Sequence, residues 1–445
     1  MTERTIAATE GVDVTTIDNE VGQKVGAVSP ARVATASFVG TAIEWYDFFI
    51  FGTAAGLVFG VAFFPNLSPL SGTLAAFATF GVAFFSRPAG AIVFGHFGDR
   101  IGRKKLLVLS LVLMGSATVA IGLIPTYDQI GIAAPVLLVI ARLVQGFAVG
   151  GEWGGAVLMA VEHAPPKRRA FYGSFPQAGV PAGLVLATVA FLIVERLPDD
   201  EIMAWGWRVP FLASSALLLV GLYVRLQITE SPEFEHIRRN DQVVRRPIVD
   251  VLRSHKRPLA VGILTQAASL VPFYLVTVFV LSHGPEELGV ARETILMSLL
   301  VACVLDIFTV PYVSIVADRM GPRKMLILGS LYMAAIGYPF FWLLSTGEGW
   351  AVLVAMILIV TVGHAVTYSA VAAYVSRLFP ADVRYTGASV SYQMGGVVFS
   401  APAPFIAVTL WSATHGHWSL AAYLAAACLA TVFALMFTKT AKVSY

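Results

Sequence analysis

Long apolar runs, separated by short polar stretches, fill almost all of the chain after its first 30 residues. About 20 apolar residues are enough for a helix to cross the hydrocarbon core of a bilayer, and inside that core only helices and closed barrels satisfy every backbone hydrogen bond. The pattern therefore predicts an all-α polytopic membrane protein with twelve spans. We expect them near residues 33–62, 73–97, 105–124, 133–160, 173–194, 208–227, 259–282, 293–316, 324–344, 350–376, 386–411 and 418–437.

The basic residues of the connecting loops predict how these spans are oriented. Arginines and lysines gather in alternate loops, in the stretches 100–105, 167–169, 319–324 and 377–384. The other loops offer only Arg196 and Arg292, together with several acids. Because short cytoplasmic loops carry an excess of Lys and Arg, we expect the basic loops and both termini to lie in the cytoplasm.

The two halves of the chain repeat a motif. DRIGRKK, from Asp99, lies between the second and third spans and returns 219 residues later as DRMGPRK, from Asp318. A polar stretch with seven Arg or Lys residues separates the halves. Parallel six-helix repeats are typical of transporters that hold substrate between two bundles near mid-membrane. We expect a disordered cytoplasmic tail at 1–30, a six-helix bundle at 31–227 and a solvated cytoplasmic linker at 228–258. A second six-helix bundle at 259–438 and a second cytoplasmic tail at 439–445 should follow.

Composition agrees with a membrane protein and argues against several other classes. Of 445 residues, 57% are hydrophobic and 13% charged, whereas soluble domains have about 25% charged residues. The net charge of +3 does not suggest a nucleic-acid partner. Cys303 and Cys428 fall in apolar spans and are expected to be small buried hydrophobes. The sequence has no ATP-binding G-x-x-x-x-G-K-[ST] loop, no metal-ligand cluster and no nucleophile beside a base. We therefore expect that the protein is not an enzyme and holds no cofactor or metal. We also expect it to be a monomer in the lipid bilayer.

The stretch GTAIEWYDFFIFG, from Gly40 to Gly52, places two carboxylates inside the first span. Asp47 lies near mid-bilayer, where an ionised side chain costs on the order of 2.5–3.5 kcal/mol and usually marks a proton or ion pathway. Asp47 is therefore the main candidate for proton coupling, against a purely structural pairing of helices. Glu44 shares its helix face but lies nearer the cytoplasm, where a supporting or gating role is as open as proton coupling.

Two arginines lie at a similar depth in the same half of the chain. Arg142 is near the middle of the fourth span and Arg87 near the middle of the second. A buried carboxylate needs a compensating partner, and either arginine could supply the positive charge in one shared site with Asp47. Either guanidinium could also bind a substrate carboxylate, and Gln145, close to Arg142, is a further candidate for substrate binding.

Polar residues of the second half are candidates either for substrate binding or for interhelical hydrogen bonds. His364 and Tyr368 are four residues apart and share a helix face, which makes them the best pair. Tyr274 is the next choice, and Gln393 lies in the eleventh span. Asp306 is the one acid deep in the eighth span.

Both DR-x-G loops could act as a gate, besides carrying the basic residues that set the orientation of the spans. An aspartate can cap a helix N-terminus, and basic side chains can latch onto acids or helix C-termini when the inner side closes. Inner loops need basic residues in any case, but two copies at equivalent positions favour a gate. The candidate gate residues are Gly95, Asp99, Arg100, Gly102, Arg103, Lys104, Glu152, Asp318, Arg319, Gly321 and Arg323.

Four stretches carry a further pattern. They are EWYDFFIFG (44–52), FSRPAGAIVFGHFGDRIGRKK (85–105), RLVQGFAVGGEWGGA (142–156) and WGWRVPF (205–211). Together they resemble the major facilitator superfamily and, within it, the metabolite:proton symporter family. The resemblance implies two six-helix bundles, Asp47 as the proton site with Arg142 as its partner, Arg87 as a carboxylate ligand, and the DR-x-G loops as inner gates.

The resemblance also implies a function. Members of this family take up shikimate, α-ketoglutarate, citrate, proline or glycine betaine, so we expect proton-coupled symport of a small organic acid or zwitterionic metabolite by alternating access in a bacterial plasma membrane. A proline/glycine-betaine osmolyte symporter, a proton-independent facilitator and a membrane sensor are alternatives. The stretch Leu264 to Tyr274 lacks the charged residues of shikimate-type members, which argues against shikimate itself.

Overall fold

The apolar runs form helices, as their length predicts. The computed structural model describes residues 29–240, 243–281, 284–285 and 289–436. Within these ranges twelve helices are long and apolar enough to cross a membrane, and no strand occurs. The prediction of an all-α chain with twelve spans is therefore confirmed, whereas the two expected tails lie, apart from residues 29 and 30, outside the described residues.

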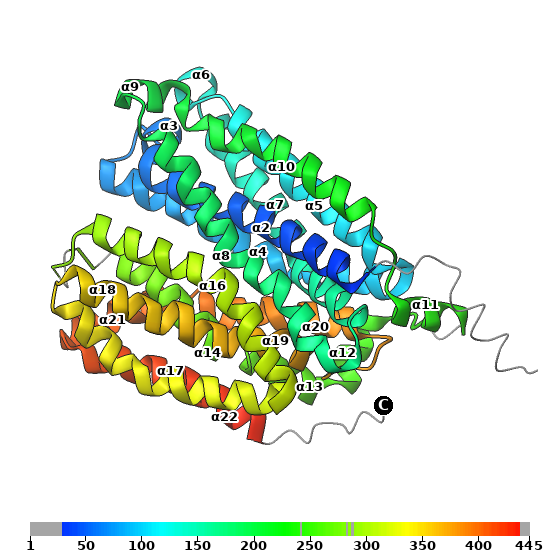
Figure 1. Ribbon diagram of the computed structural model, residues 1–445. Helices are drawn as coiled ribbons and strands as arrows, with labels where there is room; N and C mark the ends of the chain where they lie inside the picture. Colours follow the sequence, from blue (N-terminus) through cyan, green and yellow to red (C-terminus); the bar gives the residue numbers. More distant parts are fainter. Residues whose placement is uncertain (1–28, 241–242, 282–283, 286–288, 437–445) are drawn as a thin grey trace, which may run out of the picture.

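The first six spans form one bundle, drawn in blue to green in Figure 1. Its first span runs from α2 through a π-helical turn, η1, into α3, and short helices occupy its loops. The helices of this bundle are α2 (Pro30–Ala54), η1 (Ala55–Phe59), α3 (Gly60–Phe63), α4 (Pro69–Ile101), α5 (Arg103–Leu123), α6 (Tyr127–Ile130), α7 (Ala133–Glu162), η2 (Pro166–Arg168), α8 (Arg169–Val194), α9 (Asp199–Glu201), η3 (Ile202–Gly206) and α10 (Arg208–Leu226).

The last six spans form the second bundle, drawn in green to red. Three of its spans are interrupted by π-helical turns, which are often found at functional sites. The helices are α13 (Lys256–Leu264), α14 (Ala267–Tyr274), η4 (Leu275–Val280), α16 (Arg292–Met320), α17 (Pro322–Ser345), α18 (Gly349–Met356), η5 (Ile357–His364), α19 (Ala365–Val375), α20 (Arg384–Gly395), η6 (Gly396–Ser400), α21 (Ala403–Thr414) and α22 (His417–Met436).

The charge of the linker predicts a solvated segment, but the structure shows that part of the linker is packed against the bundles. It contains two short helices, α11 (Pro232–Arg239) and α12 (Pro247–Ser254). Phe234, Ile237 and Val251 are buried, so each helix places an apolar side chain against the bundles. The linker is therefore part of the packed structure.

Glycine makes the sharp turn inside each DR-x-G motif. Gly102 lies between α4 and α5 with a φ of 114°, and Gly321 lies between α16 and α17 with a φ of 91°. Glycine adopts such positive φ values at little cost, because it has no Cβ. The two copies of the motif thus produce the same turn in each bundle.

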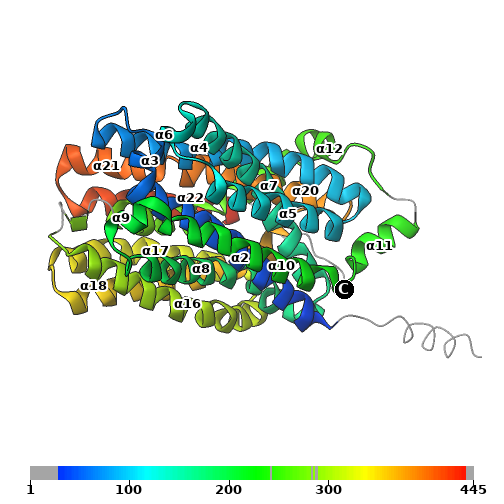
Figure 2. The ribbon, with the colours of Figure 1, turned by 90° about the horizontal axis from the view of Figure 1, so that it is seen from above.

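The two bundles lie side by side along their length (Figures 1 and 2). Helix α8 packs on α16, and α20 packs on α4 and α7. In both views α11 and α12 lie at one end of the molecule, and α6, α9 and α18 at the other. We call the first of these the DR-x-G end, because Asp99 and Asp318 lie there and contact the opposite bundle.

Candidate functional site

Asp47 is buried inside the first bundle with only part of its carboxylate bonded. Its side chain, on α2, is 1% exposed. One oxygen, Oδ1, accepts a hydrogen bond from the Ser214 hydroxyl of α10 at 2.6 Å. The other oxygen, Oδ2, has no hydrogen-bond partner. The carboxylate is therefore removed from water and has one free acceptor atom.

The expected pairing of Arg142 with Asp47 is not present in this conformation. Among the described residues, no ion pair joins Asp47 to Arg142 or to Arg87. The Arg142 guanidinium lies 3.9 Å from the centre of the Phe51 ring and donates to Gln145 Oε1 at 2.8 Å. The aromatic face and this amide therefore take the place that the carboxylate was expected to occupy beside the guanidinium.

Both polar atoms of Gln145 are used inside the first bundle. Its oxygen accepts from Arg142, and its amide nitrogen donates to Thr118 Oγ1 at 2.7 Å. Arg142 also donates to the Phe80 carbonyl at 3.2 Å. These bonds connect α7 to α4 and α5, so Gln145 serves as a link between helices of the first bundle in this conformation.

Arg87 is a buried cation that forms no ion pair with any acid of the described residues. Its guanidinium lies over the rings of Phe84, at 4.3 Å, and Phe48, at 4.8 Å, and its Nε atom has no hydrogen-bond partner. Tyr274 of the second bundle lies beside it, with its ring 6.1 Å from that of Phe84. Arg87 is thus located where the two bundles meet.

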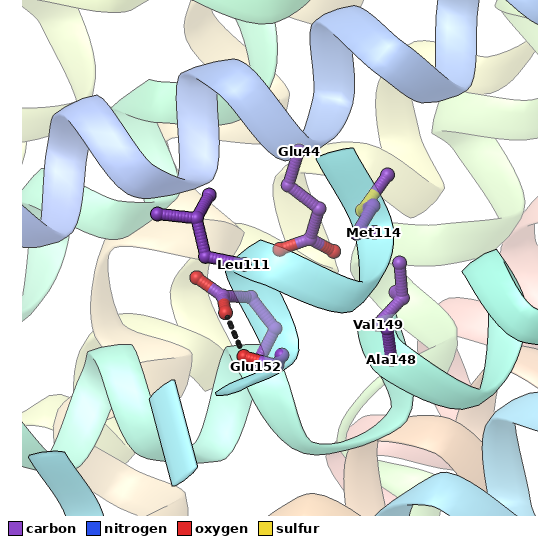
Figure 3. A pocket seen from close by; sticks show the side chains of 7 residues that line it. Glu44, Leu111, Met114, Ala148, Val149 and Glu152 are labelled. Carbon is purple, nitrogen blue, oxygen red and sulfur yellow. Dashed lines mark hydrogen bonds between the residues drawn. The ribbon is translucent and has the colours of Figure 1, made fainter. Parts of the chain in front are cut away.

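Glu44 faces a small cavity inside the first bundle (Figure 3). Seven side chains from α2, α5 and α7 line this cavity, and two of them, Glu44 and Glu152, are acids. Glu44 is 6% exposed, and Figure 3 shows its carboxylate pointing towards Glu152. Glu44 and Asp47 therefore have separate surroundings, although they lie on one turn of α2.

Glu152 is an anchor of the first bundle in this conformation. It pairs with Arg225 of α10 and accepts a hydrogen bond from the Ser110 hydroxyl of α5 at 2.8 Å. Arg225 also donates to the Leu107 carbonyl and packs on Gly40, where a Cβ would overlap the guanidinium. This pair joins four helices of one bundle and does not cross to the other.

The second bundle presents aromatic and amide side chains to the first. The Tyr368 and Tyr392 hydroxyls are hydrogen-bonded at 2.9 Å. The Tyr392 ring stacks on Trp153 with centres 4.1 Å apart, and the Gln393 amide donates to the Val149 carbonyl at 3.2 Å. Tyr368 and Gln393 thus lie at the bundle interface, whereas His364 is bonded to Asp306 within the second bundle.

Each DR-x-G aspartate caps a helix of the opposite bundle. The Asp99 carboxylate accepts from the backbone N–H groups of Tyr385 and Thr386, at 3.1 and 2.8 Å, and from the Thr386 hydroxyl. These groups open α20. The Asp318 carboxylate accepts two hydrogen bonds, at 2.8 and 2.9 Å, from the first backbone N–H groups of α8. An acid at a helix N-terminus satisfies free donors and the positive end of the helix dipole.

A network of charges surrounds the cap on α20. Arg103 of α5 pairs with Glu162 at the end of α7, and Glu162 pairs with Arg384, the first residue of α20, at 3.0 Å. Glu233 of the linker helix α11 pairs with Arg384 and, at 3.2 Å, with Arg169. The network joins both bundles and the linker at the DR-x-G end.

Several predicted gate residues lie outside this network. The Lys104 ammonium donates to the Leu226 carbonyl at 2.8 Å, within the first bundle. Arg323 donates to the last carbonyls of α22, at 2.9 and 3.3 Å, within the second. Arg100 and Arg319 are exposed and form no ion pair among the described residues.

Missing side chains at two glycines allow α20 to approach α4. A Cβ at Gly95 would lie 2.7 Å from the Thr386 Cα atom, and a Cβ at Gly98 would overlap the Tyr385 ring. Gly102, by contrast, lies against the Glu230 carboxylate, which accepts from the first N–H groups of α5.

Sequence reasoning missed some of the residues that complete the site. Ser214, Arg225, Glu162 and Glu233 bond to predicted residues or bridge the bundles, and none of them was predicted. Arg225 and Glu162 are charged residues at the ends of predicted spans, which is a usable signal. A lone serine such as Ser214 gives none.

Comparison with known proteins places this geometry in a family. The sequence profile of the Major Facilitator Superfamily matches residues 37–404. The inner membrane metabolite transport protein YhjE of Escherichia coli (strain K12) is 42% identical, over 95% of this chain and 97% of the relative. The shikimate transporter of Escherichia coli (strain K12) is 40% identical, over 92% and 94%.

A solved structure shares the fold. A proton:xylose symporter, XylE, bound to 6-bromo-6-deoxy-D-glucose has a TM-score of 0.75 and 18% identity, over 92% of this chain and 96% of that one. The resemblance seen in the motifs and the two-bundle architecture are thereby confirmed, as is the expectation that the chain is not an enzyme. The chain belongs to the Major Facilitator Superfamily and is a multi-pass membrane transporter of metabolites.

Proposed function

We propose that the protein is a proton-coupled symporter that imports a small carboxylate-bearing metabolite, an organic acid or a zwitterion, across a bacterial plasma membrane. The observation that carries this proposal is the Arg87 guanidinium, which is buried at the bundle interface and, within the described part of the chain, forms no ion pair. Relatives that transport metabolites support the general class.

The charge balance around Arg87 favours an anionic ligand. Arg87 and Arg142 both lie over the ring of Phe48, at 4.8 and 5.7 Å, and neither has an acidic partner among the described residues. Aromatic faces stabilise a buried cation by about 2 kcal/mol or more, but they neither neutralise its charge nor accept its N–H bonds as a bidentate carboxylate does. A substrate carboxylate would supply the missing negative charge.

Asp47 is the proposed proton site. A buried carboxylate without a cation is costly when ionised, and its protonation removes that cost. The free oxygen Oδ2 is the atom that would carry the proton, while Oδ1 keeps its bond to Ser214. Arrival of a substrate anion near Arg87 and of a proton at Asp47 would leave the loaded bundle closer to neutral, which favours reorientation through the membrane.

The two helix caps are the proposed inner gate. Asp99 and Asp318 each bind the other bundle at the DR-x-G end, which we expect to face the cytoplasm because of its basic loops. With both caps formed, that side is closed. Release of substrate and proton into the cytoplasm then requires the caps to break as the bundles rock apart.

Uptake into proteoliposomes tests the proposal. Purified protein is reconstituted and offered a panel of labelled monocarboxylates, dicarboxylates, amino acids and betaines, with and without an imposed inward proton gradient. We expect at least one carboxylate-bearing compound to accumulate above its external concentration only when the gradient is present.

Liposomes without protein and a gradient collapsed by a protonophore are the controls. Equal uptake with and without the gradient would identify a facilitator rather than a symporter. Failure of every compound in the panel to accumulate would remove Arg87 as a carboxylate ligand.

A further inference from the structure

Asp306 and His364 form a buried pair in the second bundle. His364 Nδ1 lies 2.8 Å from Asp306 Oδ2, and the two side chains are 6% and 1% exposed. Asp306 is near the middle of α16, and His364 is near the middle of the span 349–375. The pair thus lies deep in the bundle, and the functional roles proposed above do not include it.

Stability alone does not explain this pair. Taking two charges out of water costs several kcal/mol per ion, and apolar residues of similar volume often serve a core as well or better. Asp306 Oδ1 also has no hydrogen-bond partner, so the pair is only partly compensated. Ionisable residues inside a membrane are functional by default, and His364 ends the π-helical turn η5, a type of irregularity common at functional sites.

Aromatic side chains connect the pair to the first bundle. The Tyr368 ring lies against His364, with centres 4.6 Å apart. Its hydroxyl bonds to Tyr392, whose ring stacks on Trp153 of the first bundle. Gln177 of the first bundle donates to the Tyr368 carbonyl at 3.3 Å. His364 is therefore separated from the first bundle by a single side chain, that of Tyr368.

A second aromatic contact leads in the other direction. The Phe273 ring lies 5.6 Å from His364 and 6.3 Å from Trp45 of α2, the helix that carries Asp47. The imidazole thus lies between the rings of Phe273 and Tyr368. A charged imidazolium binds aromatic faces more strongly than a neutral ring does, so protonation would tighten both contacts.

Few other titratable groups surround the pair. Helix α18 carries none, and α8 carries its two, Arg169 and Tyr172, in its first turns at the DR-x-G end. The remaining titratable side chains of the helices packed against η5, apart from the charged residues at the helix ends, are cysteine or tyrosine: Cys303 and Tyr312 of α16, Tyr332 and Tyr338 of α17, Tyr274 of α14, and Tyr368 and Tyr374 of α19. All of these are normally uncharged near neutral pH, so Asp306 is the charged group that governs His364.

We propose that Asp306 and His364 form a second proton-binding site, whose occupancy controls the Tyr368–Tyr392–Trp153 contact between the bundles. The proton binds at Nε2 of a neutral His364, whose Nδ1–H stays bonded to the Asp306 carboxylate. The pair then changes from one negative charge to none. Its role in coupling rests on the proposed symport, but proton binding by the pair does not.

Histidine NMR of the full chain in lipid nanodiscs tests the site without a substrate. The protein has 8 histidines, and His364→Gln identifies the resonance that belongs to position 364. We expect this resonance to move with pH as the ring gains a proton, and its midpoint to fall by about one unit or more in Asp306→Asn, since an adjacent carboxylate favours the charged imidazole by about that much. His417→Gln, at the start of α22, is the matched control and should leave the midpoint unchanged.

The pH profile of substrate counterflow, which needs no net gradient, is the second readout. We expect the profile of Asp306→Asn to shift in the same direction as its NMR midpoint. A position-364 resonance that keeps one protonation state from pH 5 to pH 9 in the wild type overturns the proposal, as does an unchanged midpoint in Asp306→Asn. If wild-type uptake ignores the proton gradient while His364 still titrates, the symport is disproved and the proton site stands.

Discussion

Asp47 and Arg87 lie in the same bundle, and each keeps part of its polar surface without a partner. The free Asp47 oxygen and the free Arg87 Nε are both deeply buried, where an unmade hydrogen bond costs about 1–3 kcal/mol. Arg225 and Glu152, a few turns away, satisfy each other. At the scale of residues, the two side chains that we propose bind proton and substrate are thus among the buried groups with a polar atom left unpaired.

Asp47→Asn removes the proton-binding group while keeping the shape of the side chain. We expect gradient-driven accumulation to be lost, because asparagine cannot take up and release a proton, while exchange of substrate across the membrane continues. Accumulation and counterflow in proteoliposomes measure the two separately. Asp199→Asn, on the exposed helix α9, is the control, and full accumulation by Asp47→Asn would exclude Asp47 as the coupling residue.

Arg87→Lys keeps the charge but removes the planar fork that matches a carboxylate. We expect the substrate affinity to fall by about 10- to 100-fold, in keeping with the 1.5–3 kcal/mol of a hydrogen bond to a charged group. Binding is measured by scintillation proximity with the compound found in the uptake panel. Arg292→Lys, on the exposed start of α16, should bind normally, and an unaffected Arg87→Lys would leave Arg87 with a packing role.

The depth of these residues could be predicted from the sequence, but their partners could not. Counting along an apolar run places Asp47, Arg87 and Arg142 near mid-membrane. Whether Arg142 meets Asp47 depends on how α7 is rotated against α2, and in the structure the Phe51 ring binds the guanidinium instead. Ser214, the partner that Asp47 does have, looks like any small polar residue of an apolar span.

Among the elements, the helices α20 and α8 depend on acids from the opposite bundle for their first turns. Capping of this kind is typically worth about 1 kcal/mol. In each copy of the DR-x-G motif, the glycine with positive φ, Gly102 or Gly321, makes the turn that follows the capping aspartate. The caps therefore tie the start of two helices to the closed state of the DR-x-G end.

Asp99→Asn weakens the cap on α20, because an amide has one acceptor oxygen and no charge. We expect the closed state to lose about 1 kcal/mol, about a five-fold change in its population ratio. The labelling rate of a cysteine introduced at Ser389, which is buried in α20, should rise accordingly, and the two native cysteines are buried. Asp200→Asn, on α9, is the control, and an unchanged rate would show that the cap does not hold the gate.

Close packing of α4 and α7 leads to another prediction. A Cβ at Gly150 of α7 would overlap the carbonyl of Arg87 in α4, whereas a Cβ at Gly81 of α4 meets nothing within 4 Å. We expect Gly150→Ala to cost about 1–3 kcal/mol of stability through overpacking and Gly81→Ala to cost little. Thermal unfolding in detergent compares the two variants, and equal melting temperatures would contradict the tight contact.

Helix positions were more predictable than helix details. The twelve apolar runs correspond to the twelve spans because burial in lipid demands length and hydrophobicity. The π-helical turns, such as η5, arise from packing between helices and leave no periodic signal. The linker helix α11 was missed because its charged residues outnumber the two apolar side chains, Phe234 and Ile237, that it buries.

At the scale of the whole molecule, both caps stabilise the same state, in which the two bundles are in contact at the DR-x-G end. If the bundles move as rigid bodies, breaking either cap should loosen both. We therefore expect Asp318→Asn to raise the labelling rate of a cysteine at Ser389, and Asp99→Asn to raise that of a cysteine at Ser174, which touches Ser314 across the interface. The double variant should show the sum of the two free-energy changes. Loosening confined to the altered cap would show that the bundles do not move as units.

The exchange of caps between bundles also has a consequence for synthesis of the chain. Asp99 and its partner Tyr385 are 286 residues apart, which a ribosome covers in about 15–60 s at 5–20 residues per second. Throughout that interval the Asp99 carboxylate lacks the N–H groups of α20 and has Arg103, at 3.9 Å, as its ion-pair partner in the first bundle. The first N–H groups of α8 likewise lack Asp318, which follows Ala170 by 148 residues. The first bundle is thus synthesised before the partners of its caps exist, and the DR-x-G end can close only after the second bundle has been made.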